Sequence, residues 1–502
     1  MKRAVAVLLL LGLLFQAAAG GFPVYSSNVP REEFQPGAPA PLDMPTWADG
    51  WFNGTLYRGQ EAAGTVEGYL AVGRRPTVGR FEGQWKEDGG DGGTLAGRFY
   101  GPLVVGGAAG GSGMRPLLGW LTRNDTHFGL RLLSPVTGGA LSVEGTHYES
   151  FLPAPSGPYP IGTQTVHLVD ESRGEEFTED EEDFREMMVQ LWYPAGETRG
   201  ERAEYMDPVT FGWLKHRAPI PLFMIPDRAY TFVHTHAYLE ADAAPGAFPV
   251  LVFSHGYDGV RAIYTSLIEE LASHGFVVAA VNHPYIAGIT VFPDGRTVEL
   301  APVPGDAQQR DLYFQRAFRA VTGDILFTLD YLTRCNDLHP ILSGHLDLER
   351  VGVYGHSFGG GATADVCLRD ARFRAGATLD GFFRGEVVQA GLETPLLLML
   401  AEGRTRGSDI QELWSSLEGS AYRAEVNGSA HYSYTDVGIL LSHLAPLLPR
   451  GILGFGSIDP GRLVFITNAL LRAFFDVHLN GAPVGTLLSL ADEFEEVWFA
   501  YR

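Results

Sequence analysis

A serine between two glycines is the residue of this chain best suited to do chemistry. Residues 355–359 read Gly-His-Ser-Phe-Gly, a G-x-S-x-G pattern with Ser357 at its centre. A strand-like run, 351–354, precedes the pattern and a helix-like stretch follows it, the order that a nucleophile elbow requires. A serine hydroxyl is a weak nucleophile, so it needs a neighbouring base and N–H groups aimed at the developing oxyanion. The pattern therefore predicts that Ser357 is an activated nucleophile.

Two further residues follow later strand-like runs. Asp380 comes directly after residues 375–379, and His431 lies in the loop after residues 422–426. In an open α/β sheet the working groups lie beyond the carboxyl ends of the strands. We expect His431 to take the proton of Ser357 and Asp380 to fix the tautomer of His431. The order Ser, Asp, His along the chain is that of α/β-hydrolases.

Two other carboxylates in the sequence could orient His431 in place of Asp380. Glu402 and Asp409 lie in the loop after the next strand-like run, 396–400, where many α/β-hydrolases carry this carboxylate. Asp380 is favoured because it ends its strand directly, in a turn closed by Gly381. The alternative roles are a helix N-cap for Asp380 and an ordinary loop residue for His431.

The oxyanion donors are predicted at two turns. Residues 253–259 read Phe-Ser-His-Gly-Tyr-Asp-Gly, so a strand ends here in an H-G turn of the kind that supplies one donor. The backbone N–H groups of Tyr257 and Phe358 are the expected donors.

The rest of residues 157–502 alternates strands with helices. Short runs rich in β-branched residues and Leu between helical stretches indicate a mostly parallel sheet covered on both faces. The acidic run 175–182 is expected to be a solvated hairpin tip. Expected strands are 166–170, 187–193, 250–253 and 277–281, and expected helices are 262–274 and 309–334.

The first half of the chain has a different character. Residues 1–19 have a basic start, an apolar run and an Ala-x-Ala site, which predicts a cleaved signal peptide and a secreted, periplasmic or extracellular protein. No later run reaches 18 apolar residues, so no integral membrane segment is expected after cleavage. Residues 20–48 read as an arm rich in Pro, Ala and Gly.

A repeat defines an all-β domain at residues 49–152. The form G-x-φ-x-G-x-φ, in which φ is apolar, begins at Gly50, Gly64, Gly79 and Gly93. Such alternation predicts strands, and the spacing leaves room for one strand and its turn. The domain is either a structural appendage or a module that contacts a surface or polymer.

Composition excludes some functions. The net charge of −22 over 502 residues argues against nucleic acid, whose phosphates need basic patches. His216, His234 and His236 have no Cys or carboxylate cluster nearby, so no metal and no cofactor is expected. The two cysteines, Cys335 and Cys367, are expected either to form a disulfide or to remain two buried thiols.

Short motifs occur together at 157–159, 191–194, 253–256, 271–276, 355–360, 379–381, 428–431 and 456–459. On these motifs, residues 157–480 resemble the plasma-type platelet-activating-factor acetylhydrolases and their bacterial dienelactone-hydrolase-like relatives. The resemblance implies an α/β-hydrolase fold, with nucleophile, acid and base at Ser357, Asp380 and His431. It also implies oxyanion donors at Tyr257 and Phe358. True dienelactone hydrolases have a Cys nucleophile, and this chain differs from them in having Ser357 at that position.

The predicted function is that of an exported serine esterase. The resemblance implies hydrolysis of a short acyl ester, such as the sn-2 acyl group of a phospholipid of the platelet-activating-factor type. The apolar stretch 437–455 follows the base and either borders the acyl pocket or belongs to the core. Two alternatives remain: a hydrolase of polyesters or small carboxylic esters, and a surface-binding protein with an inert hydrolase fold.

Overall fold

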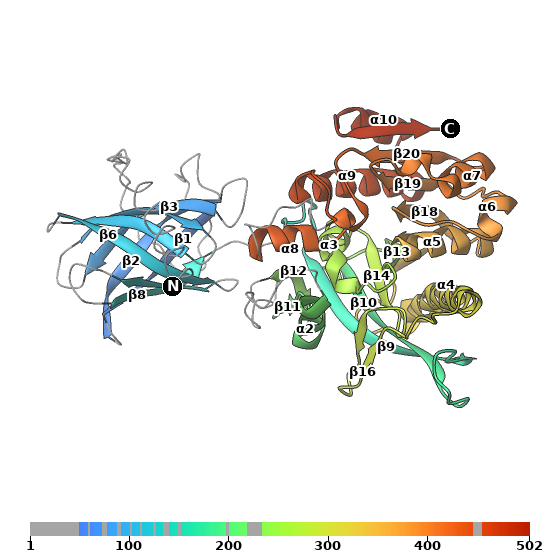
Figure 1. Cartoon of the computed structure of the whole chain (residues 1–502), viewed down its shortest axis with the longest axis horizontal. Helices are drawn as coiled ribbons and strands as arrows, with labels where there is room; N and C mark the ends of the chain where they lie inside the picture. Colours follow the sequence, from blue (N-terminus) through green and yellow to red (C-terminus); the bar gives the residue numbers. More distant parts are fainter. Residues whose placement is uncertain are drawn as a thin grey trace. The chain divides into compact units, whose positions relative to one another are not determined.

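The chain forms two compact units, Met1–Glu149 and Ser150–Arg502. The computed structural model describes eight strands between residues 50 and 147, together with residues 152–196, 200–217, 233–444 and 454–502. Residues 1–49, which carry the predicted signal peptide and arm, lie outside the described residues. Figure 1 shows the strands and helices of both units.

The first unit is a closed antiparallel β-barrel, as the blue and teal strands of Figure 1 show. Each strand pairs with the next along the chain, and β1 also pairs with β8, which closes the barrel. The predicted all-β domain is therefore present. Its strands are β1 (Gly50–Arg58), β2 (Glu61–Val72), β3 (Val78–Glu87), β4 (Gly92–Tyr100), β5 (Leu103–Gly110), β6 (Gly113–Arg123), β7 (His127–Leu133) and β8 (Ala140–His147).

The glycine repeat serves close packing between neighbouring strands. Phe81 of β3 pairs in register with Gly97 of β4. A Cβ added to Gly97 would lie 2.6 Å from Cζ of Phe81, so only glycine admits the ring there. Val66, Phe81 and Phe99 are buried, as the period-2 pattern predicts.

The second unit is built on an eleven-stranded sheet. Its order is β11-β12-β9-β10-β14-β13-β17-β18-β19-β20-β21, and the six strands from β14 to β20 in this order are parallel. Strands β15 (Ile289–Val291) and β16 (Thr297–Glu299) form a separate ribbon. The eleven strands are β9 (Ile161–Gly174), β10 (Phe184–Pro194), β11 (Arg202–Glu204), β12 (His234–Leu239), β13 (Phe248–Ser254), β14 (Val277–Asn282), β17 (Leu346–His356), β18 (Phe373–Leu379), β19 (Leu396–Ala401), β20 (Ala421–Val426) and β21 (Val497–Tyr501).

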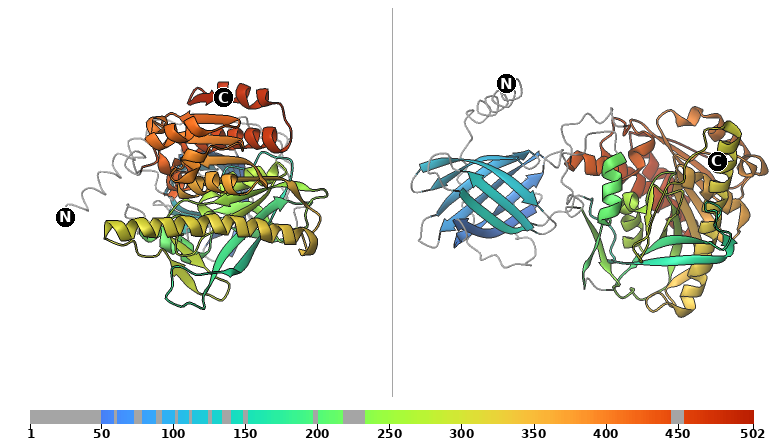
Figure 2. Two further views of the ribbon diagram at one scale, coloured as in Figure 1. Left: turned by 90° about the vertical axis from the view of Figure 1, so that its right-hand side faces the viewer. Right: turned by 60° about the horizontal axis from the view of Figure 1, so that its bottom comes forward.

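Helices cover both faces of this sheet, so its central strands are buried on both sides. Every residue of β13 and of β19 is buried, which explains their continuous apolar runs. Helices α3 and α9 pack on one face, while α4, α5 and α7 pack on the other. Figure 2 shows the long helix α4, in yellow, running across the sheet. The helices are α2 (Pro208–Arg217), α3 (Thr265–Ser273), α4 (Ala307–Leu338), α5 (Phe358–Arg369), α6 (Glu386–Ala390), α7 (Ser408–Ser416), α8 (Val437–Leu444), α9 (Pro460–Leu479) and α10 (Val484–Asp492).

The acidic run after β9 differs from the prediction at its first residue. Strands β9 and β10 form the expected antiparallel hairpin. Glu175, however, is only 8% exposed and accepts a hydrogen bond of 2.8 Å from Nη1 of Arg185. The run is therefore solvated only in part, because the hairpin brings a buried cation against its first carboxylate.

Two of the three histidines considered as metal ligands bond to neighbouring groups, and the side chain of the third, His234, lies outside the described residues. His236 bonds through Nδ1 to Oε2 of Glu269 at 2.8 Å, and His216 bonds to the carbonyl of Gly212 at 2.6 Å. Both cysteines are free and buried, Cys335 on α4 and Cys367 on α5, which is the second of the two alternatives. Among the described helices, none is both long and apolar enough to cross a membrane.

Candidate active site

The strand β17, a sharp turn and the helix α5 hold Ser357. The backbone of Ser357 has φ 54° and ψ −112°, a region that non-glycine residues occupy at a cost of about 1–3 kcal/mol. A Cβ on Gly355 would lie 2.5 Å from the backbone of Gly359, and one on Gly359 would lie 2.2 Å from the carbonyl oxygen of Ser254. Both glycines of the pattern are thus required by close backbone contact.

The structure brings the three predicted residues together. Nε2 of His431 lies 2.8 Å from Oγ of Ser357, and Nδ1 of His431 lies 2.5 Å from Oδ2 of Asp380. Ser357 follows β17, Asp380 follows β18, and His431 lies in the loop after β20. The carboxyl ends of three strands therefore bring Ser357 and Asp380 to the imidazole of His431.

Asp380 is held rigidly. It has φ 47°, its N–H donates to the carbonyl of Met399 at 2.7 Å, and its Oδ1 accepts from the N–H of Ala401 at 3.0 Å. Burial alone raises the pKa of a carboxyl. Bonds from His431 and Ala401, together with the charge of Arg404, nevertheless keep the pKa of Asp380 below its usual range. The carboxylate is therefore ionised and aimed at the histidine.

The two rival carboxylates have other partners. Asp409 accepts from both terminal nitrogens of Arg404, at 3.0 and 2.9 Å. Glu402 accepts from the N–H of Gly428 at 2.8 Å. Neither of them bonds to His431.

The two proposed oxyanion donors carry uncommitted N–H groups. Phe358 is the first residue of α5, so its N–H has no carbonyl one turn earlier to bond. Within the described residues, the N–H of Tyr257 likewise donates to no acceptor. The rings of the two residues pack 5.9 Å apart, and the hydroxyl of Tyr257 lies 3.0 Å from that of Tyr313. Their side chains are thus fixed by one another and by Tyr313.

Aromatic side chains border the histidine. Phe382 is 47% exposed and Tyr432 is 57% exposed, and their ring centroids lie 5.4 and 5.3 Å from that of His431. The guanidinium of Arg404 lies over the ring of Phe382 at 4.8 Å. These rings give the rim of the site an apolar surface. Helix α8 begins the apolar stretch after the base, whose residues 445–453 lie outside the described residues.

Sequence reasoning missed a second cluster of the same residue types. Oγ of Ser254 lies 3.0 Å from Nε2 of His283, and Nδ1 of His283 lies 2.9 Å from Oδ2 of Asp324. All three residues are fully buried, and Arg185 also donates to Asp324. The signal in the sequence is weak, because Ser254 is only the residue before the H-G turn.

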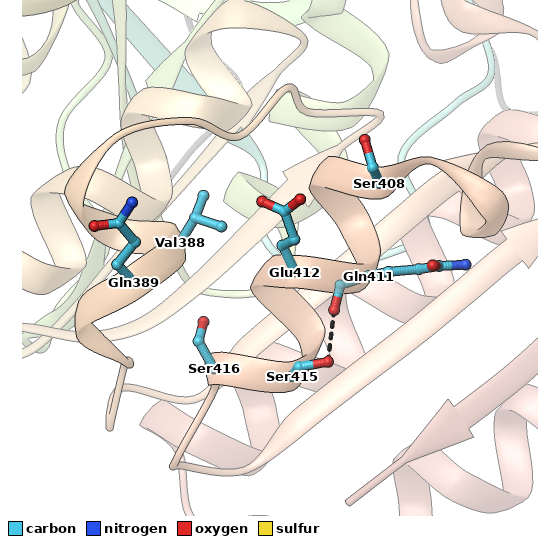
Figure 3. Close-up of a pocket in the computed structure, with 7 residues that line it drawn as sticks. All are labelled: Val388, Gln389, Ser408, Gln411, Glu412, Ser415 and Ser416. Atoms are coloured by element: carbon cyan, nitrogen blue, oxygen red, sulfur yellow. Dashed lines mark hydrogen bonds between the residues drawn. The ribbon is translucent and has the colours of Figure 1, made fainter.

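A groove between α6 and α7 contains none of these residues (Figure 3). The hydroxyl of Ser415 donates to the carbonyl of Gln411 at 2.7 Å. No imidazole lines the groove, so its serines lack the contact with a histidine that Ser357 makes. Its lining residues are Val388, Gln389, Ser408, Gln411, Glu412, Ser415 and Ser416.

A largely parallel sheet covered by helices, with Ser, Asp and His meeting beyond its strand ends, defines an α/β-hydrolase. The family described as platelet-activating factor acetylhydrolase, isoform II, matches residues 145–294 and 334–482, more than half of the chain. The chain belongs to this family, which confirms the resemblance inferred from the motifs.

Individual relatives agree with this assignment. The platelet-activating factor acetylhydrolase of Cavia porcellus is 29% identical over 46% of this chain and 58% of its own length. The probable 1-alkyl-2-acetylglycerophosphocholine esterase of Arthroderma benhamiae is 25% identical over 69% of this chain and 93% of its own length. The chain thus spans little more than half of the animal relative.

Bacterial relatives act on other esters. The bis(hydroxyethyl) terephthalate hydrolase of Streptomyces coelicolor is 27% identical over 39% of this chain and 54% of its own length. The structure of a ferulic acid esterase from Streptomyces cinnamoneus superposes with a TM-score of 0.59 at 32% identity. It covers 69% of this chain and 98% of its own.

Proposed function

We propose that this protein is an exported serine esterase that hydrolyses short acyl esters, in particular the sn-2 acyl group of phospholipids of the platelet-activating-factor type. The observation that carries the proposal is the continuous hydrogen-bonded line from Ser357 through His431 to Asp380. Family membership supports the choice of substrate.

Acylation begins when Oγ of Ser357 attacks the ester carbonyl. The hydroxyl proton passes to Nε2 of His431, 2.8 Å away, while Asp380 stabilises the imidazolium through Nδ1. The N–H groups of Tyr257 and Phe358 bind the oxyanion of the tetrahedral intermediate. Collapse of this intermediate breaks the bond to the alcohol, which takes the proton from His431 and leaves an acyl-serine.

Deacylation repeats the sequence with water. His431 takes a proton from the water as its oxygen attacks the acyl carbonyl, and the same two N–H groups hold the second oxyanion. The proton then returns to Ser357 as the carboxylic acid departs. The reactants of the two half-reactions are the ester and one water molecule, and the products are the alcohol and the carboxylic acid.

A hydrolase of small carboxylic esters or polyesters is the second candidate. The half-exposed rings of Phe382 and Tyr432 beside His431 favour it, because they offer an aromatic acyl group a surface to stack on. The terephthalate hydrolase and the ferulic acid esterase among the relatives point the same way.

The barrel is assigned no part in the chemistry, and we propose a surface or polymer contact for it. All proposed chemical groups lie in the second unit. Residues 157–502 alone are therefore expected to turn over soluble esters. An inactive fragment beside an active full-length protein would show that the barrel is part of the catalytic core.

One substrate panel tests the proposal. The purified full-length protein is given p-nitrophenyl acetate, butyrate and octanoate, a phosphocholine lipid with an sn-2 acetyl group, and bis(hydroxyethyl) terephthalate. We expect turnover of the acetyl phospholipid and the short p-nitrophenyl esters, with the octanoate slower.

Each other outcome has its own meaning. Turnover of the terephthalate and aryl esters without the phospholipid would favour the second candidate. No turnover of any ester would leave a surface-binding protein with an inert hydrolase fold. Ser357→Ala serves as the control for hydrolysis by contaminants.

A further inference from the structure

Three separate turns meet at the site, and two buried side chains connect them. The turns are the one after β13, which carries Tyr257, the elbow at Ser357, and the loop of His431. Tyr264 is 1% exposed and His356 is 2% exposed, and neither takes part in the proposed proton transfers.

The connection is a continuous chain of hydrogen bonds. The N–H of Gly256 donates to Oη of Tyr264 at 3.3 Å, and that hydroxyl lies 2.8 Å from Nδ1 of His356. Nε2 of His356 lies 2.9 Å from the carbonyl oxygen of His431. The chain therefore runs from the residue before one proposed oxyanion donor to the backbone of the proposed base.

Only one arrangement of protons satisfies every bond. The carbonyl of His431 can only accept, so Nε2 of His356 must carry a proton. Burial, reinforced by the neighbouring His431, lowers the pKa of His356 to about 3, so the ring is neutral and its Nδ1 is an acceptor. The hydroxyl of Tyr264 must then donate to Nδ1, which leaves its lone pairs for the N–H of Gly256.

Packing holds the chain in place. A Cβ on Gly256 would lie 3.0 Å from Nδ1 of His356 and 3.5 Å from Oη of Tyr264, so a side chain there would press on both partners. The rings of His356 and His431 lie 4.7 Å apart and are tilted by 37°. Glycine at position 256 is thus explained by the chain as well as by the turn.

We propose that Tyr264 and His356 are positioning residues, which hold the Tyr257 donor and His431 in register with Ser357. The inference rests on the proposed esterase function. It predicts a loss of rate without a loss of substrate binding, because both held groups act on the tetrahedral intermediate rather than on the bound ester.

The first test pairs two buried tyrosines that differ in their hydroxyl partners. Tyr264→Phe removes two bonds of the chain. Tyr354→Phe makes the same chemical change at a fully buried residue whose hydroxyl has no partner among the described residues. On p-nitrophenyl acetate, we expect Tyr264→Phe to lower kcat about tenfold with KM within about twofold. Tyr354→Phe should stay within about twofold of wild type in both. Equal kcat values for the two variants would overturn the proposal.

The second test asks for rescue at His356. His356→Phe keeps an aromatic ring but loses both bonds, and we expect kcat to fall about a hundredfold. His356→Gln keeps one donor and one acceptor and should recover about tenfold of that loss. Rates are compared per folded molecule, measured by circular dichroism, so that instability is not read as lost positioning. A glutamine variant no better than the phenylalanine variant would contradict a hydrogen-bonding role.

A third measurement does not depend on turnover. In protein labelled with ¹⁵N in the histidine rings, the His356 signals, identified by their absence in His356→Gln, should show the tautomer protonated on Nε2 from pH 5 to 9. A proton on Nδ1 would overturn the chain of bonds. If the wild-type protein hydrolysed no ester, the proposed function would fail, while this spectrum would still decide whether the chain of bonds exists.

Discussion

Two Ser-His-Asp arrays lie in the same unit, and they differ in their exposure to solvent. In the first, Ser357 is 9% exposed and the side chain of His431 is 28% exposed. In the second, Ser254, His283 and Asp324 are all fully buried, although their hydrogen bonds have ordinary lengths of 3.0 and 2.9 Å. The residue types and their bonds do not by themselves make a catalytic site.

The charges around the two aspartates differ as much as their exposure. Asp324 bonds to Arg185 and to Arg173, so its charge is already balanced by two cations. Burial, with these arginines, lowers the pKa of His283, which keeps that ring neutral. Among the cations of the described residues, only Arg404 lies near Asp380, 3.6 Å away, so the negative charge of Asp380 remains available to an imidazolium. We infer that the array of Ser357 is suited to proton transfer and that the array of Ser254 stabilises the fold.

The largest expected difference separates the two serines. Ser357→Ala should lower kcat about 10⁶-fold, because the members of such an array act as a unit. Ser254→Ala should leave kcat within about tenfold and lower the free energy of unfolding by about 1 kcal/mol, since His283 loses one partner. Steady-state kinetics on p-nitrophenyl acetate and urea unfolding of both variants measure the contrast. If Ser357→Ala kept more than about a hundredth of wild-type activity, the assignment of Ser357 as the nucleophile would be wrong.

The next difference concerns which carboxylate orients His431. Asp380→Asn should lower kcat about 10⁴-fold by favouring the wrong tautomer of the histidine. Asp409→Asn and Glu402→Gln should each stay within about tenfold, because these carboxylates bond to Arg404 and Gly428 instead. The kcat values of the three variants show which carboxylate orients His431. A strongly impaired Asp409→Asn beside an active Asp380→Asn would show that Asp409, and not Asp380, has this role.

The buried aspartate should matter for stability. Asp324→Asn leaves Arg185 with a reduced counter-charge in the core and should cost about 3–5 kcal/mol of unfolding free energy. Asp380→Asn should cost less, because Asp380 lies beside a partly exposed histidine. Urea unfolding at pH 7 gives both values, and the comparison fails if Asp380→Asn is the less stable protein.

The stability of the protein at acid pH should depend more on Asp324 than on Asp380, although this effect is smaller. The pKa of each aspartate lies below its usual value, so the unfolded chain binds more protons and stability is lost as the pH falls below about 4. Burial raises the pKa of Asp324, but the charges of Arg185 and Arg173 and the bond from His283 lower it, whereas the cation near Asp380 is Arg404. Thermal unfolding from pH 2 to 7 should therefore lose more of its pH dependence in Asp324→Asn than in Asp380→Asn. Equal flattening would contradict this ranking.

Local sequence signals predicted which three residues come together around His431. The strand before Ser357, the glycines around it and the position of Asp380 directly after a strand are all properties of short segments. The topology of a parallel sheet then brings those strand ends together. This explains why residues 74 positions apart, His431 and Ser357, could be paired in advance.

The second array and the closing of the barrel could not be predicted in this way. Arg185 and Asp324 are 139 positions apart on a strand and a helix, and neither has a distinctive local pattern. Strand β5 does not begin a copy of the glycine repeat, and its residues 106–110 are only Gly and Ala, which are typical of a loop. The pairing of β1 with β8 depends on strands far apart in sequence. His356 was hidden for another reason, since it occupies a variable position of the G-x-S-x-G pattern.

The most direct test of the central claim is to label the nucleophile. A fluorophosphonate reacts with an activated serine, which displaces fluoride and forms a stable phosphonyl ester. The tetrahedral phosphorus of this ester resembles the tetrahedral intermediate that the serine forms with an ester substrate. Full-length protein is treated with the reagent, and the adduct is located by intact mass and peptide mapping. We predict one adduct per chain, on Ser357, with parallel loss of esterase activity and no labelling of Ser357→Ala. An adduct on Ser254, or full activity with Ser357 labelled, would contradict the account.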